Sequence, residues 1–227
     1  MARKKQSKGS CSYCGKEMAK GGMTRHLATC SKRGEVIKEF QTKPDASELL
    51  YHLRVEDAWG GDFWLNLEMR GRATLEDLDN YLRAIWLECC GHMSRFSPGG
   101  WRSDDIDMDR RADQIFESGL TLTHHYDFGT TSETLVKVTS WRQGVATTDW
   151  PIALMARNSP PEAGCIECGE PASWLCMECL IEEDVYGTLC NQHAETHPHD
   201  EYGEPVELVN SPRLGMCGYD GPAEPPY

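Results

Sequence analysis

The chain has no apolar run that approaches the ~20 residues needed to span a membrane. Its N-terminal segment, MARKKQSKGS, lacks the apolar stretch of a secretory signal peptide. These two absences predict a cytoplasmic protein without a membrane anchor, in a compartment where thiols stay reduced. The eleven cysteines of the 227-residue chain therefore indicate metal binding or redox chemistry before disulfide bonds.

Known catalytic motifs are also missing. No P-loop, nucleophile elbow or paired-carboxylate arrangement is present. The tripeptide HAE at 193–195 begins like a zinc deaminase motif, but no P-C-x-x-C follows it. The segment from Asp105 begins like a calcium loop, yet Arg110 replaces the required glycine and Phe116 the bidentate glutamate. The sequence favours a binding protein over an enzyme.

Positive charge is scarce outside the N-terminus. The net charge is −13, but residues 1–34 carry nine Lys/Arg against one acid, while the rest of the chain carries 14 against 35. A polyanion is attracted to the first segment and repelled by the rest, so a nucleic-acid contact is predicted there. The candidate contacts are Lys4, Lys5, Lys8, Lys20, Arg25, Lys32 and Arg33.

A first group of metal ligands lies in the same segment. Cys11, Cys14, His26 and Cys30 follow the pattern C-x2-C-x11-H-x3-C. Two cysteines on a knuckle, with two ligands one helical turn apart, are typical of a tetrahedral zinc finger.

The middle of the chain reads as an α+β domain with a small, mostly antiparallel sheet and packed helices. Alternating apolar residues predict a hairpin over 51–69, and a 3–4 apolar spacing after the N-cap Thr74 predicts a helix to Gly91. A short helix over 107–118 and strands over 120–128, 133–141 and 150–156 complete it. The predicted divisions are a basic arm and finger (1–34), a linker (35–48), the α+β domain (49–156), a Cys/His-rich module (157–221) and a tail (222–227).

Eight further candidate ligands lie between residues 165 and 199, spaced C-x2-C-x7-C-x2-C-x10-C-x2-H-x3-H-x-H. Four ligand pairs match two closed zinc sites in a cross-braced, B-box-like module. One site would hold Cys165, Cys168, Cys190 and His193, and the other Cys176, Cys179, His197 and His199. The alternatives are a single zinc with His197 or His199 on the surface, or Cys217 as a substitute ligand. In all, three zinc ions are predicted.

Three stretches resemble the plasmid Ri open-reading-frame-three-like family, whose members are also labelled insertion-element passenger, TnpR-type proteins. They are LYHLRVEDAWGGDFWLNLEMRGRATLEDLDNYLRAIWLECCGHMSRF, HHYDFGTTSETLVKV and VNSPRLGMCGYDG. The resemblance covers roughly residues 49–221 and extends in longer members to the N-terminal finger. It implies a small α+β core and an association with mobile elements, without an established activity.

Three functional hypotheses follow. The first is a non-enzymatic zinc-binding adaptor that contacts DNA or RNA through residues 1–34. The second is a protein-interaction module in which the C-terminal zinc module and the acidic body bind a basic protein partner. The third is an enzyme of unrecognised type that gathers a metal at its acidic run of Asp104, Asp105, Asp107 and Asp109.

Overall fold

The computed structural model describes residues 7–41, 47–87, 91–199, 201–216 and 219. The chain divides into two compact units. The first, which we call the sheet unit, comprises residues 1–82 and 92–159. The second, the C-terminal module, comprises residues 160–226 and the segment 83–91.

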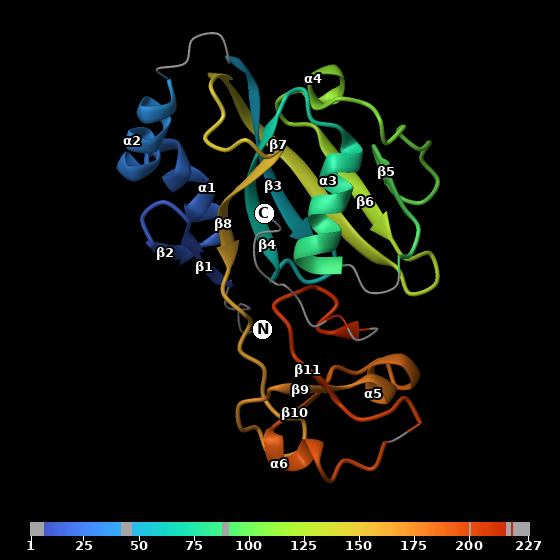
Figure 1. The fold of residues 1–227 in the computed structure, drawn as a ribbon. Helices are drawn as coiled ribbons and strands as arrows, with labels where there is room; N and C mark the ends of the chain where they lie inside the picture. Colours follow the sequence, from blue (N-terminus) through green and yellow to red (C-terminus); the bar gives the residue numbers. More distant parts are fainter. Residues whose placement is uncertain (1–6, 42–46, 88–90, 200, 217–218, 220–227) are drawn as a thin grey trace. The chain divides into compact units, whose positions relative to one another are not determined.

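The sheet unit is built on one antiparallel sheet of eight strands in the order β2-β1-β8-β4-β3-β7-β6-β5 (Figure 1). Its strands are β1 Lys8–Cys11, β2 Glu17–Ala19, β3 Glu48–Asp57, β4 Trp64–Arg70, β5 Ser94–Ser97, β6 Thr121–Tyr126, β7 Ser132–Gly144 and β8 Ile152–Asn158. The α+β class and the antiparallel sheet are confirmed. The prediction of a small sheet was wrong, because β1 and β2 of the predicted finger extend it.

Four helices belong to this part of the chain: α1 Lys20–Thr29, α2 Ser31–Phe40, α3 Leu75–Leu82 and α4 Ala112–Ile115. Helix α2 extends through Phe40 into the stretch predicted as a linker (35–48), whereas α4 is shorter than predicted. Helix α3 continues as the π-helical turn η2, Arg83–Leu87. Its predicted N-cap is present: the Asp77 N–H donates to the Thr74 hydroxyl, and the Thr74 N–H donates to the Asp77 carboxylate.

The two faces of the sheet differ in chemistry. Strand alternation places Leu53 and Val55 of β3 on the face that α3 covers, and His124 of β6 bonds Asp79 of α3 there at 2.7 Å. The neighbouring His125 points to the other face and stacks on Trp101, as alternation predicts. On that second face, Asn66 and Glu68 of β4 contact the N-terminal helices.

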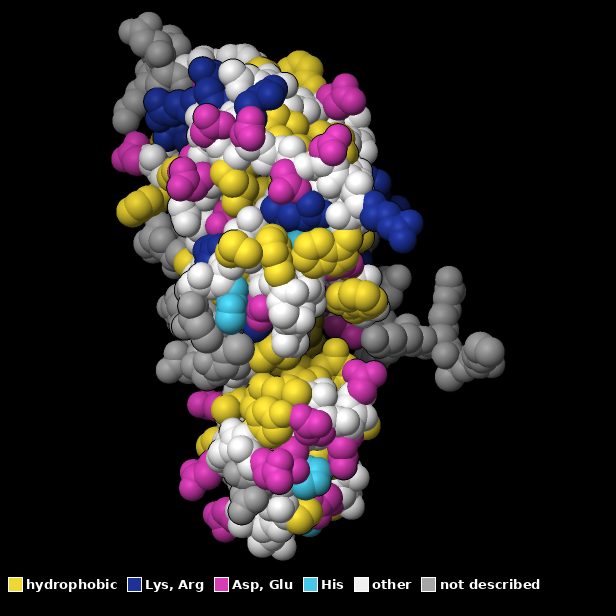
Figure 2. All heavy atoms as spheres, turned by 90° about the vertical axis from the view of Figure 1, so that its right-hand side faces the viewer, with side chains coloured by type: hydrophobic (Ala, Val, Ile, Leu, Met, Phe, Trp, Pro, Cys, Tyr) yellow, Lys and Arg dark blue, Asp and Glu magenta, His cyan; other side chains and the backbone are white. Residues whose placement is uncertain are grey.

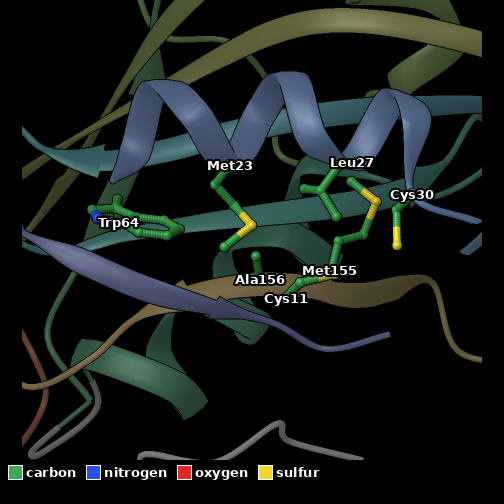
Figure 3. Close-up of a cluster of buried hydrophobic side chains, with 7 residues drawn as sticks. All are labelled: Cys11, Met23, Leu27, Cys30, Trp64, Met155 and Ala156. Atoms are coloured by element: carbon green, nitrogen blue, oxygen red, sulfur yellow. The ribbon is translucent and has the colours of Figure 1, made fainter. Parts of the chain in front are cut away.

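The predicted finger is part of the sheet unit. Strand β1 pairs with β8, so that Cys11 lies opposite Ala156. Figure 3 shows Met23 and Leu27 of α1 packed over this edge. The buried cluster consists of Cys11, Met23, Leu27, Cys30, Trp64, Met155 and Ala156. The finger is therefore anchored by apolar packing and by a strand ladder, as well as by its ligands.

The C-terminal module has a smaller antiparallel sheet of three strands in the order β10-β9-β11. Its elements are β9 Trp174–Cys176, α5 Met177–Glu182, β10 Gly187–Leu189, α6 Asn191–Ala194 and β11 Val206–Glu207. The segment 83–91 joins this unit through hydrogen bonds from the Ser211 hydroxyl to Trp86 O and from the Tyr219 hydroxyl to Ala84 O. No described helix of either unit is long and apolar enough to cross a membrane.

Candidate metal centres

All twelve predicted ligands gather into three groups of four, with the membership that their spacing predicts. Within each group the ligand atoms lie within 4.8 Å of one another. A tetrahedral zinc ion, with Zn–S near 2.3 Å and Zn–N near 2.0 Å, places its ligand atoms ~3.3–3.8 Å apart. The sulfur–nitrogen and sulfur–sulfur contacts within the groups, from 3.2 to 3.9 Å, match that geometry.

The N-terminal group joins a strand, a turn and a helix. Cys11 ends β1, and the turn back to β2 carries Cys14, with Gly15 in the left-handed region at φ 70°. His26 on α1 brings Nε2 to 3.3 Å from the Cys14 sulfur, and Cys30 ends the same helix. Burial raises the pKa of the Cys11 thiol to about 11, so metal binding at neutral pH must displace its proton.

The second group joins the loop of Cys165 and Cys168 to helix α6, whose N-cap is Cys190 and which carries His193. The Nδ1 of His193 lies 3.3 Å from the Cys190 sulfur and 3.4 Å from the Cys165 sulfur. The sulfurs of Cys168 and Cys190 are 3.9 Å apart. Burial raises the pKa of Cys165, but backbone N–H groups from Cys190, Glu167 and Cys168 outweigh it and bring the pKa to about 6. Such N–H groups stabilise the thiolate that a metal needs.

The third group includes both histidines whose role the sequence left open. His199 Nδ1 lies 3.2 Å from the Cys179 sulfur and 3.7 Å from the Cys176 sulfur. His197 Nε2 lies 3.3 Å from the Cys179 sulfur. The group is complete without the alternative ligand Cys217, which lies outside the described residues.

The predicted nucleic-acid contacts are in mixed surroundings. Lys4 and Lys5 lie outside the described residues. Lys8 and Arg25 are exposed, and the exposed Lys32 bonds Glu35 at 2.8 Å. In contrast, two of the predicted contacts form ion pairs with strand residues: Lys20 with Glu56 at 2.5 Å, and Arg33 with Glu68 at 2.8 Å.

The Glu68 carboxylate is a feature that the sequence reasoning missed. It is 4% exposed and accepts hydrogen bonds from Arg142 as well as Arg33. Burial raises its pKa, but the two guanidinium groups outweigh burial and hold the pKa below its usual value. The sequence of β4 does indicate that this face is buried. All six residues of the run WLNLEM are buried, so both faces of the strand must be covered by other parts of the protein.

The acidic residues 104–109, which were considered as a metal site of an unrecognised enzyme, do not form a group that could hold a metal ion. Among the described residues, the candidate metal groups are the three Cys/His groups alone. Asp105 forms an ion pair with Arg95 instead.

Comparison with known proteins adds little. No protein family and no curated protein matches this chain. Among solved structures, one match is a protein of unknown function from Methanosarcina mazei Go1, at 15% sequence identity and a TM-score of 0.40. The match covers 46% of this chain and 66% of that protein, and a similarity this weak carries no argument.

Proposed function

We propose that this chain is a non-enzymatic protein with three zinc ions, whose C-terminal module binds a basic segment of a protein partner. Thiolate and imidazole ligands in four-coordinate groups are typical of zinc. Each group already supplies four protein ligands, so none keeps the open position that a catalytic zinc uses for water. That ligand count supports a structural role for the metal.

The observation that carries the proposed partner is the division of charge. Residues 160–227 contain 14 acids and one basic residue, a net charge of −13, which equals that of the whole chain. Residues 1–159 contain 22 of each sign and are neutral. The single basic residue of this C-terminal segment, Arg213, is only 2% exposed. Acidic side chains accordingly recur over the module's surface (Figure 2), which attracts a polycation and repels nucleic acid.

A hollow in the module provides a specific place for a cationic side chain. It has a volume of about 630 Å³ and is lined by Trp174, Asn191, Ala194, Glu195, Glu204 and Pro205. The Trp174 indole N–H donates to Asn191 Oδ1 at 2.8 Å, which holds the ring in place. An aromatic ring beside two carboxylates suits the ammonium of lysine or the guanidinium of arginine.

Nucleic-acid binding through the N-terminal segment is the second candidate, and the exposed Lys8 and Arg25 favour it. The resemblance to plasmid Ri proteins suggests a mobile-element setting for both candidates. There, the basic partner that we propose is a DNA-binding protein such as a transposase. Deletion of residues 1–34 would not separate the candidates cleanly, because it removes two strands of the sheet.

A direct test measures binding of a fluorescent lysine-rich peptide and of duplex DNA to the full chain at two salt concentrations. The peptide is expected to bind and to dissociate as salt rises. The double variant E195Q/E204Q should weaken peptide binding several-fold more than E162Q/D184N. The latter removes two exposed charges that do not line the hollow.

Two results would contradict the proposal. One is equal effects of the two double variants, which would show that the hollow has no specific role. The other is DNA binding tighter than peptide binding and weakened by K8Q/R25Q, which would favour the second candidate.

A further inference from the structure

The two ligand groups of the C-terminal module share one outer carboxylate, that of Glu167. This residue lies between the ligands Cys165 and Cys168 in the first loop of the module. Its Oε1 is 2.8 Å from Nδ1 of His197, a ligand of one group. Its Oε2 is 3.7 Å from Nε2 of His193, a ligand of the other group.

The nitrogens that face Glu167 are those left free by metal binding. His193 turns Nδ1 to the sulfurs of its group, so its Nε2 is the outer nitrogen. His197 turns Nε2 to Cys179, so its outer nitrogen is Nδ1. When each imidazole binds a metal through its inner nitrogen, the outer nitrogen carries the proton. The outer N–H of His197 donates a hydrogen bond to Glu167 at 2.8 Å, whereas that of His193 faces the same carboxylate at 3.7 Å, just beyond hydrogen-bond distance. A carboxylate that accepts this bond fixes the ring and strengthens the ligand.

The third histidine of the module has a separate partner. Nε2 of His199 lies 3.8 Å from Oε1 of Glu183, and neither atom belongs to the Glu167 contacts. Glu183 therefore faces a histidine of one ligand group, whereas Glu167 faces a histidine of each group. The module offers a matched pair of carboxylates that differ in this respect.

We propose that Glu167 is a positioning residue that couples zinc binding at the two sites of the module. An ion in one site orders its histidine, which holds the Glu167 carboxylate in place for the histidine of the other site. The module then gains and loses its two ions together, and its acidic surface forms only when both are bound. This inference rests on the zinc occupancy given under the proposed function.

The test follows zinc loss from the full chain by native mass spectrometry during titration with a chelator. In the unmodified protein, chains with three ions are expected to give way to chains with one, and two-ion chains should not accumulate. In E167Q both sites should weaken by about tenfold or more, and two-ion chains should accumulate. E183Q should weaken one site and leave Glu167 in place, and E162Q should behave as the unmodified protein.

Each result is informative. Accumulation, from the unmodified protein, of chains that hold the N-terminal ion and one of the two module ions would overturn the coupling through Glu167. Identical titrations of E167Q and the unmodified protein would overturn it as well. Fewer than three ions in the fully loaded protein would instead contradict the zinc assignment under the proposed function. If E167Q purified without zinc at either module site, reconstitution of E167D with zinc would decide. Recovery of joint loading with a shorter carboxylate supports the coupling, and independent loading contradicts it.

Discussion

The N-terminal and C-terminal metal groups have similar ligands but different surroundings. The N-terminal group lies against a sheet, where Met23, Leu27 and Trp64 are at most 1% exposed. Around the ligand groups of the C-terminal module, a buried cluster consists of Cys165, Cys176, Cys179 and Leu189, so three of its four members are ligands themselves. The same ligand chemistry therefore adds to an apolar cluster at the N-terminal group, whereas at the C-terminal groups the ligands themselves make up most of the buried cluster.

Metal removal should separate the two regions most strongly. A chelator is expected to unfold the C-terminal module, since structural zinc contributes on the order of 10 kcal/mol to folds of this kind. Strands β3, β4, β6, β7 and β8 should persist on their apolar core. Limited proteolysis would show cleavage after residue 160 and a surviving fragment of the sheet unit. Equal resistance of both regions would show that the module has a metal-independent core.

Substitution of one glycine in each region should destabilise that region without affecting the other. A Cβ at Gly9 would lie 2.0 Å from Arg157 O, in the β1–β8 ladder, and one at Gly187 would lie 2.5 Å from the Cys179 Cβ. Gly9→Ala should lower the melting temperature of the sheet unit, whereas Gly187→Ala should remove zinc from the module. Thermal melts and zinc analysis would distinguish them. Gly21→Ala is the control, because nothing lies within 4 Å of its added Cβ.

The apolar packing that holds the finger on the sheet can be reduced by a substitution that leaves its four metal ligands unchanged. Leu27→Ala should cost about 2–5 kcal/mol of sheet-unit stability, because it leaves a cavity in a closed cluster. Urea unfolding with zinc in excess would measure the loss. Trp141→Ala, at a side chain that is 56% exposed, should have a much smaller effect. Similar losses in both variants would contradict the assigned role of the cluster.

The ion pairs of Glu68 should contribute least. Glu68→Gln leaves Arg33 and Arg142 without their carboxylate and should cost about 2 kcal/mol, less than a fully buried pair because both arginines retain some exposure. The pKa of Glu68 is lowered in the folded state, so its contribution is present above the unfolded pKa, near 4.3. It is lost as pH falls through the folded pKa. Urea unfolding at pH 7 and at pH 3 should therefore show a smaller difference between variant and unmodified protein at the lower pH.

Ligand membership was the part of the molecule best predicted from the sequence. Local spacing decides which residues share a knuckle or a helical turn, so Cys11, Cys14, His26 and Cys30 could be grouped without knowing the fold. The hairpin and the N-cap Thr74 were likewise local and are confirmed.

The prediction of a small sheet failed because the size of the sheet depends on long-range pairing. The pairing of β1 with β8 joins residues about 150 positions apart, and no local pattern encodes it. For the same reason, the sequence could not show that Lys20 and Arg33 meet acids of β3 and β4. The sequence counts both as exposed positive charges, whereas in the fold Lys20 pairs with Glu56 and Arg33 with Glu68.

Hydrogen exchange of the full chain, with and without a chelator, tests the central contrast most directly. It reports on β1, β8 and the C-terminal module in one experiment. We predict that the amides of β9, β10, α5 and α6 lose their protection when zinc is removed, while those of β3, β4 and β8 keep theirs. Loss of protection in both regions at the same chelator concentration would contradict the account.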